Sequence, residues 1–506
     1  MKRTTLSLIA VATALAAVTG FAALTAPDGT TTTTLAAKLP VPVERSSLLC
    51  PAPSTSEVAE TVYTSYTPTA KIGTTVPGKA ATKKAELKPA QAAATPVDDK
   101  PKKPVAAKAP ATVAEPGKPV TAEANGGNAP ALTGSATGAL APGWTVQQTT
   151  VVPAGGARGL LGVSCTAPDT DFWFPAASTA KERQDYVHLT NPDDTAAVAD
   201  IELYGPEGAL PSQLTEGIPV PAHSSVPVLL STLTGEAAKP DVTVHVTTRS
   251  GRVGAVIRSA DEKLGSDWLP ASADPAARAV LPGIPKDATS VRLVAYAPGQ
   301  DDADLKIQLV GQSGTIVPAS AQSLHVKSGM TAAVDLPDLT RGEPGSLLLT
   351  PTDPKKATPV VAALRVVRGK GDEQEVAFIP ATSAITSRAT VADNRAAGST
   401  LSLTAPGETA EVRVTASAGS EGGTPVSKTF TVKGGTTTAV TPPVPEGLKG
   451  SYALTVERLS GGPVHAARTL ALPEDGIPMF TVQTLSDDRG TVEVPTAEQD
   501  LSVLDD

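Results

Sequence analysis

From about residue 143 onward, the chain alternates apolar and polar positions in short runs that end at turn residues. Three such runs each stop at a proline, namely Pro192, Pro298 and Pro406, and a second alternating run follows each one directly. Apolar side chains at every second position predict half-buried β-strands. The three prolines are separated by 106 and 108 residues, which is the size of one β-sandwich domain.

The remainder of each period also matches. Every period continues with further paired strands and finishes with a closing strand, at 268–271, 378–381 and 480–482. No amphipathic helix of useful length interrupts these strands. The pattern therefore predicts an all-β fold of tandem immunoglobulin-like antiparallel β-sandwich units. We expect three full units, at residues 178–272, 273–382 and 383–486.

A fourth, degenerate unit is predicted upstream, at residues 39–177. Its closing strand is expected at Phe172-Trp173-Phe174-Pro175-Ala176, which resembles Asp267-Trp268-Leu269-Pro270-Ala271, and earlier strands are expected near 39–49 and 60–66. Residues 67–142 interrupt the unit with Ala, Pro, Thr, Gly and Lys and almost no large apolar side chain. Such a segment buries too little surface to offset chain entropy, so we expect a long disordered insertion.

Charge adds three expectations. Ten lysines and five acidic residues lie between Lys71 and Glu123, although the whole chain has a net charge of -9. The basic segment is either a solvated tether or an attachment to anionic polymers or lipid head groups of the envelope. The acidic balance argues against nucleic acid as a partner. Residues 487–506 are expected to form an acidic C-terminal tail.

The first residues resemble an export signal. Lys2 and Arg3 precede nineteen uncharged, mostly apolar residues from Leu6 to Leu24. This arrangement predicts a signal peptide or an uncleaved N-terminal membrane anchor at residues 1–26. We therefore expect an extracytoplasmic protein, either secreted or tethered to the outer face of the cytoplasmic membrane, that meets the membrane only through this segment.

The chain has two cysteines, Cys50 and Cys165. An exported protein with only two thiols usually joins them, so we predict a Cys50–Cys165 disulfide across the basic insertion. The alternative is two unpaired thiols. Two distant cysteines alone do not provide the ligands of a metal site.

Three large aromatic residues, Trp173, Trp268 and Phe378, occupy similar places in the predicted closing strands. A large residue on the same strand of every repeat is typical of a sandwich core, and this is the role we expect. Exposed aromatic rings would instead suggest platforms for sugars.

Catalytic and metal-binding patterns are missing from the sequence. The five histidines are scattered, and neither H-E-x-x-H nor G-x-S-x-G occurs. Acidic residues at the first hairpins, 193–194 and 301–304, are interpreted as solvated turns rather than calcium loops. We therefore expect no catalytic residue, no metal and no cofactor, and the chain is interpreted as a non-enzyme.

Two further stretches carry a resemblance to a known family. Residues 43–51, VERSSLLCP, and residues 157–165, ARGLLGVSC, which lead to Phe172-Trp173-Phe174-Pro175, resemble an uncharacterised family of exported actinomycete proteins with a domain of unknown function. The resemblance implies an envelope location. It implies no activity, cofactor or catalytic residue.

Two functions from different classes are compatible with these observations. The first is a non-catalytic cell-envelope protein that acts as a structural or protein-interaction module for another envelope protein. The alternative is a glycan-binding or accessory factor in cell-surface glycan assembly, which the basic segment and the repeated aromatic residues would suit. The partner, the oligomeric state and the biological process are not specified by the sequence.

Overall fold

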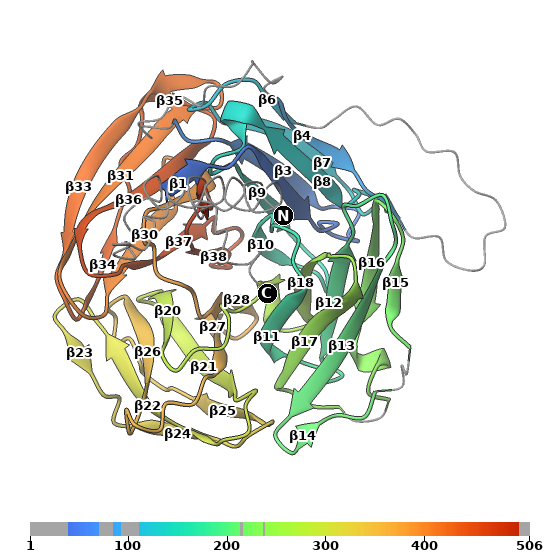
Figure 1. Cartoon of the computed structure of the whole chain (residues 1–506). Helices are drawn as coiled ribbons and strands as arrows, with labels where there is room; N and C mark the ends of the chain where they lie inside the picture. Colours follow the sequence, from blue (N-terminus) through green and yellow to red (C-terminus); the bar gives the residue numbers. More distant parts are fainter. Residues whose placement is uncertain (1–38, 70–83, 93–110, 213–215, 236–237, 495–506) are drawn as a thin grey trace, which may run out of the picture. The chain divides into compact units, whose positions relative to one another are not determined.

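The computed structural model describes residues 39–69, 84–92, 111–212, 216–235 and 238–494, and these are almost entirely β-strand (Figure 1). The chain divides into two units. The described part of the first unit is a two-stranded sheet of β1 (Leu39–Pro42) and β39 (Thr491–Val494). The second unit spans Pro42–Gly490.

The described part of the second unit contains eight sheets of four or five strands and one small two-stranded sheet. The eight larger sheets form four pairs, and the two sheets of each pair share one hydrophobic core. The unit is therefore built from four successive β-sandwiches. The all-β prediction is confirmed.

The strands have the following bounds. The first sandwich contains β2 (Arg45–Cys50), β3 (Glu60–Tyr66), β4 (Lys84–Pro89), β6 (Thr112–Val113), β7 (Val120–Asn125), β8 (Leu132–Thr137), η1 (Gly138–Leu140), β9 (Thr145–Val152) and β10 (Gly159–Ser164). The second contains β11 (Asp171–Ala177), β12 (Arg183–Thr190), β13 (Ala197–Gly205), β14 (Gly208–Ala209), β15 (Ile218–Val220), β16 (Ser224–Leu229), η2 (Leu230–Thr232), β17 (Val242–Ser250), β18 (Gly254–Asp261) and β19 (Gly265–Leu269), and β5 (Gln91–Ala92) pairs with its β16.

The third sandwich contains β20 (Ala279–Ile284), β21 (Ala288–Tyr296), β22 (Ala303–Val310), β23 (Thr315–Ile316), β24 (Ser323–Val326), β25 (Thr331–Asp335), β26 (Gly345–Pro351), β27 (Val361–Lys370) and β28 (Glu373–Pro380). The fourth contains β29 (Arg388–Asn394), β30 (Ser399–Ala405), β31 (Ala410–Gly419), β32 (Gly422–Thr424), β33 (Val426–Val432), β34 (Thr436–Val440), β35 (Glu446–Lys449), β36 (Tyr452–Gly461), β37 (His465–Ala471) and β38 (Phe480–Leu485).

The predicted disordered insertion at 67–142 is wrong for most of its length. β4, β6, β7 and β8 lie inside it and complete the first sandwich; only 70–83 and 93–110 lie outside the described residues. The core of the first sandwich needs few large aliphatic residues because the Trp144 side chain fills part of it. A Cβ atom on Gly134 would lie 2.5 Å from the Trp144 ring, and the indole donates a hydrogen bond to Ser65 at 2.9 Å.

The boundary between the first two sandwiches also differs from the predicted one at 177/178. β11, which carries Trp173, pairs with β17 and is therefore the first strand of the second sandwich. The closing strand of the first sandwich is β10, which pairs with β9. Pro175-Ala176 in β11 resembles Pro270-Ala271 after β19. Because of this similarity, the first strand of the second sandwich was interpreted as the closing strand of the first.

The four closing strands, β10, β19, β28 and β38, link the sandwiches. Each contacts the next along the chain, and β38 contacts β10. Apolar cores also cross two of the junctions: Phe378 of the third sandwich packs in the core of the second, and Phe480 of the fourth packs in the core of the third. The predicted tandem string therefore forms a closed cycle of contacts.

Two predicted terminal segments have different outcomes. The first residues of the predicted acidic tail pack on the fourth sandwich, where Asp488 forms an ion pair with Arg388 at 2.5 Å; residues 495–506 lie outside the described residues. The predicted signal or anchor at 1–26 also lies outside them. Within the described ranges, no helix has the length and apolar character needed to span a membrane.

Candidate functional site

The structure contains the predicted disulfide between Cys50 and Cys165. Cys50 ends β2 and Cys165 directly follows β10, so the bond joins the two sheets of the first sandwich. Both residues are buried, and their Cα atoms are 4.5 Å apart although they are separated by 115 positions in the sequence. A buried disulfide indicates an oxidising, extracytoplasmic compartment.

The three aromatic residues singled out in the sequence are buried. Trp268 and Phe378 are each 1% exposed, and both lie opposite an arginine on the neighbouring strand, which makes their positions equivalent. Trp173 is 8% exposed but lies on β11, so its position differs from that of the other two.

Trp173 belongs to a group of side chains on the outward face of β11, β17 and β13. This aromatic–acidic patch comprises Asp171, Trp173, Glu202, Tyr204 and His245. Cross-strand pairing places Trp173 beside His245 and His245 beside Glu202. The Trp173 and His245 rings stack with centroids 3.6 Å apart, and Tyr296 of the third sandwich lies 5.4 Å from the Trp173 ring.

The carboxylates of the patch surround His245. Its Nε2 atom lies 3.2 Å from Asp171 and its Nδ1 atom lies 3.5 Å from Glu202. The Tyr204 hydroxyl donates a hydrogen bond to Glu202 at 2.8 Å. Burial, aided by this hydrogen bond, raises the pKa of Tyr204 well above its usual value, so the phenol remains a neutral donor.

The exposed part of the patch is acidic. The side chains of Asp171 and Glu202 are 52% and 59% exposed, whereas that of His245 is 14% exposed. Two outward carboxylates beside buried aromatic rings favour contact with a cationic group. Sequence reasoning identified only Trp173 here. The available signal was the alternation Asp171/Trp173 and Glu202/Tyr204 on two strands that both pair with β17.

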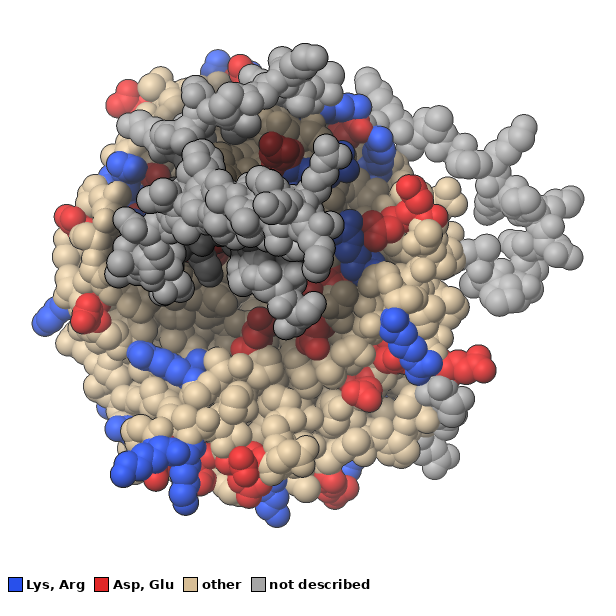
Figure 2. Space-filling view, viewed as in Figure 1, with Lys and Arg blue, Asp and Glu red and all other residues tan. Residues whose placement is uncertain are grey.

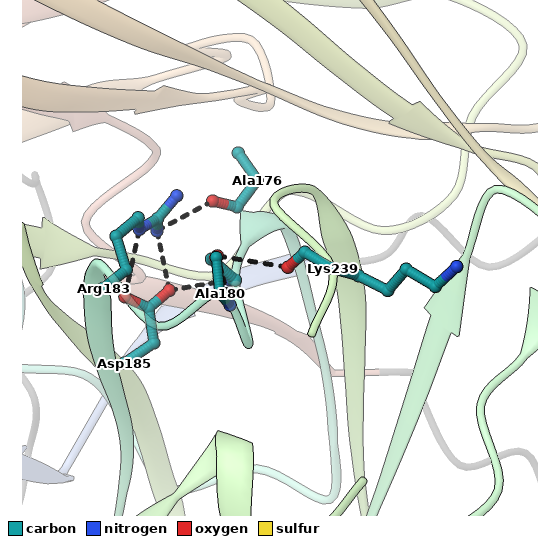
Figure 3. Close-up of polar contacts among 6 residues, drawn as sticks. Ala176, Ala180, Arg183, Asp185 and Lys239 are labelled. Atoms are coloured by element: carbon teal, nitrogen blue, oxygen red, sulfur yellow. Dashed lines mark hydrogen bonds and ion pairs between the residues drawn. The ribbon is translucent and has the colours of Figure 1, made fainter. Parts of the chain in front are cut away.

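A buried ion pair lies at the start of β12 in the second sandwich (Figure 3). The Arg183 guanidinium contacts Asp185 at 2.6 Å and donates to the Ala176 carbonyl oxygen at 3.1 Å. The Lys239 side chain points away from the pair, and its backbone carbonyl accepts from Ser178 at 3.2 Å. Arg183 also lies over the Phe378 ring, 5.5 Å from its centroid, across the junction with the third sandwich.

A second group of buried polar residues lies where the closing strands meet. Asp267 accepts hydrogen bonds from the Gly162 backbone at 3.0 Å and from the Thr481 hydroxyl at 3.0 Å. Glu375 accepts from the Leu160 backbone at 2.9 Å. Burial raises the pKa of Asp267 well above its usual range and that of Glu375 to about 8. Side chains and backbone thus fill this junction.

The acidic hairpins are paired with basic side chains. His223 lies 2.7 Å from Asp194, and His325 lies 2.8 Å from Asp304. Asp193 pairs with Arg252 at 3.0 Å. Throughout the described ranges, no group of three or more His, Cys, Asp or Glu residues is arranged to hold a metal ion. On the face shown in Figure 2, basic and acidic side chains are intermixed.

Residues 120–443 match the model of the Family of unknown function (DUF5719), which is more than half of the chain. The chain belongs to this family. The DUF5719 region begins at β7 and ends beyond β34, so it includes the aromatic–acidic patch, Asp267 and Glu375. Comparison with curated proteins and with solved structures finds no match.

Proposed function

We propose that this chain is an exported, non-catalytic cell-envelope protein that binds another protein through the aromatic–acidic patch. The observation that carries the proposal is the patch itself. It combines Tyr204, a residue type enriched at interaction hot spots, with two outward carboxylates beside the buried Trp173 ring.

The chemistry of the patch suits a partner that presents lysine or arginine. Asp171 and Glu202 are more than half exposed, and the whole chain carries a net charge of -9. A basic surface would approach the patch faster because opposite charges steer association. The stacked Trp173 and His245 rings give this contact a rigid base.

The proposed location rests on the basic and apolar residues of 1–26 and on the buried disulfide. The protein is either secreted or held at the outer membrane face by an uncleaved N-terminal segment. We further propose that the sandwiches are immunoglobulin-like repeats and that the family is actinomycete, as the sequence resemblance implies.

The alternative, a glycan-binding or glycan-assembly role, has weaker support. Trp173, Trp268 and Phe378 are at most 8% exposed, so their rings do not offer open platforms. In the described part of the basic segment, Lys84 and Lys88 both pair with Glu86, at 2.5 and 2.8 Å. These contacts partly neutralise the charge that would attract an anionic glycan.

Cross-linking the full chain in its native cells tests the proposal, with Glu202→Arg as the variant and exposed Glu343→Arg as the matched control. We expect the wild type and the control to capture the same protein and the Glu202→Arg variant to lose it. Equal capture by all three chains would contradict the patch assignment. Retention of the wild type on purified, protein-free cell wall would favour the glycan role instead.

A further inference from the structure

Four core positions differ in chemical type between otherwise equivalent sandwiches. The first strands of the second, third and fourth sandwiches all contain a β-bulge with a residue at positive φ: Ala176 at 76°, Gly283 at 91° and Asp393 at 55°. The residue that ends each of these first strands occupies the same position in all three sandwiches, and so does its partner on the neighbouring strand. A fourth equivalent position faces the core on the penultimate strand.

These positions are apolar or glycine in two sandwiches and polar in the fourth. In the second they are Ala176, Ala177, Val242 and Ile257; in the third, Gly283, Ile284, Gly345 and Leu364; in the fourth, Asp393, Asn394, Tyr452 and Arg468. The fold therefore does not require polar groups there. Their presence together in one sandwich points to a role other than packing.

Arg468 is fully buried and mostly unpartnered. Its Nη2 atom donates to the Ala392 carbonyl oxygen at 3.3 Å, but Nε and Nη1 have no hydrogen-bond partner among the described residues. Burial lowers the pKa of Arg468 to about 10, which leaves the group charged at neutral pH. A buried charge without a directly paired carboxylate is costly, whereas buried Arg183 has Asp185 at 2.6 Å.

Two further donors lie around Arg468. The hydroxyl of buried Tyr452 has no partner among the described residues, and burial raises its pKa to about 12, so it remains a neutral donor. The Arg395 side chain is 36% exposed and pairs with Asp393 at 2.9 Å, while its Nε atom is also unpartnered in the described part of the chain. Arg395 thus connects the buried group to solvent.

The charges of this group do not balance. Two guanidinium groups face one carboxylate. Among the described residues, the unpartnered atoms of the group are donors on Arg468, Arg395 and Tyr452 and one side-chain oxygen each on Asp393 and Asn394, so positive charge remains in excess. Carboxylate and phosphate oxygens are the acceptors that arginine binds most strongly. We propose that the fourth sandwich binds a small oxyanion, a carboxylate or phosphate group, through Arg468, Tyr452 and Arg395. This site is independent of the aromatic–acidic patch.

Anion-dependent thermal unfolding of the full chain tests the site. The probes are inorganic phosphate and acetate, each compared with chloride at the same ionic strength, and the readout is the unfolding midpoint together with the affinity from calorimetric titration. We expect phosphate, acetate or both to raise the wild-type midpoint, because a ligand that binds the folded state stabilises it. The stronger response identifies the oxyanion class. No response to either probe would overturn the proposal.

Arg468→Leu is the decisive variant, since Leu364 occupies the equivalent position of the third sandwich. We expect it to lose the anion response and, in chloride alone, to unfold at the same or a higher temperature than the wild type. Tyr452→Phe, which removes only the hydroxyl, should weaken binding by roughly 10- to 100-fold. Arg413→Gln in the same sandwich, where Arg413 pairs with Glu457, is the control and should keep the wild-type response. An unchanged response in Arg468→Leu would overturn the proposal.

Discussion

The Thr481 hydroxyl donates a hydrogen bond to the Asp267 carboxylate at 3.0 Å, although the two residues are 214 positions apart. Thr481 lies on β38 of the fourth sandwich and Asp267 on β19 of the second. Glu375 on β28 makes the corresponding bond to the Leu160 backbone on β10. Alternate closing strands are therefore bridged by buried carboxyl groups, and this arrangement makes the closed cycle sensitive to protonation and to side-chain size.

The first expected effect is on pH dependence. The pKa of Glu375 is raised from 4.5 to about 8 by burial, so the folded state holds its proton more tightly than the unfolded state. The free energy of unfolding should therefore fall by a few kcal/mol as pH rises from about 4.5 to about 8. Asp267 acts in the same direction.

Urea unfolding of Glu375→Gln across this pH range measures the effect. The variant should lose part of the decline with pH and be more stable than the wild type at pH 8. Glu373→Gln, an exposed change on the same strand, should follow the wild-type curve. A wild type that becomes more stable toward pH 8 would contradict this account.

The second expected effect comes from Gly162 on β10. A Cβ atom at this position would contact the Gln483 amide and lie 2.5 Å from the Thr481 methyl carbon. We expect Gly162→Ala to lower the free energy of unfolding by about 1–3 kcal/mol, because the junction between first and fourth sandwiches is closely packed. Gly299→Ala, where nothing lies within 4 Å, should have little effect. Equal denaturation midpoints for the two variants would show that the junction tolerates expansion.

The third expected effect concerns the disulfide. Replacing both Cys50 and Cys165 by alanine should cost about 2–5 kcal/mol of stability, because the bond closes a long loop and joins both sheets of the first sandwich. Chemical denaturation with and without reductant measures this. Reductant should shift the wild type toward the variant and leave the variant unchanged. A reductant-insensitive wild type would argue that the bond contributes nothing to stability.

The fourth expected effect distinguishes buried from exposed ion pairs. Asp185→Asn leaves the Arg183 charge buried without its partner, and we expect a loss of about 3–5 kcal/mol. Asp200→Asn breaks a pair with Arg249, which is 55% exposed, and should cost much less because water screens the pair. Denaturant titration of both variants gives the comparison, and similar losses would show that burial is not the deciding factor.

The sequence predicted the strands that alternate most regularly. Strands such as β12 and β21 lie where the alternating runs before Pro192 and Pro298 placed them, because one buried face fixes the period. The strands of the first sandwich within residues 67–142 were missed because their core depends on Trp144 over Gly134, a tertiary contact that composition does not reveal.

The candidate sites were less accessible to sequence reasoning. Trp173 was identified, but its partners Glu202 and His245 lie on other strands and depend on cross-strand register. Arg468 gave no signal because a lone arginine in an alternating strand is ordinarily read as solvent-facing. Only its alignment with Ile257 and Leu364 in three dimensions shows that it occupies a core position.

The contact between β38 and β10 also has a kinetic consequence. Thr481 and Gly162, which meet at this contact, are 319 residues apart, and such distant pairings form late because a large loop must first close. Three sandwiches are thus synthesised before the strand that completes the cycle is available. Until then, the surface of β10 that β38 contacts is exposed to other chains. A truncation before Phe480 should therefore favour aggregation, because it removes β38 and the Phe480 ring that packs in the core of the third sandwich.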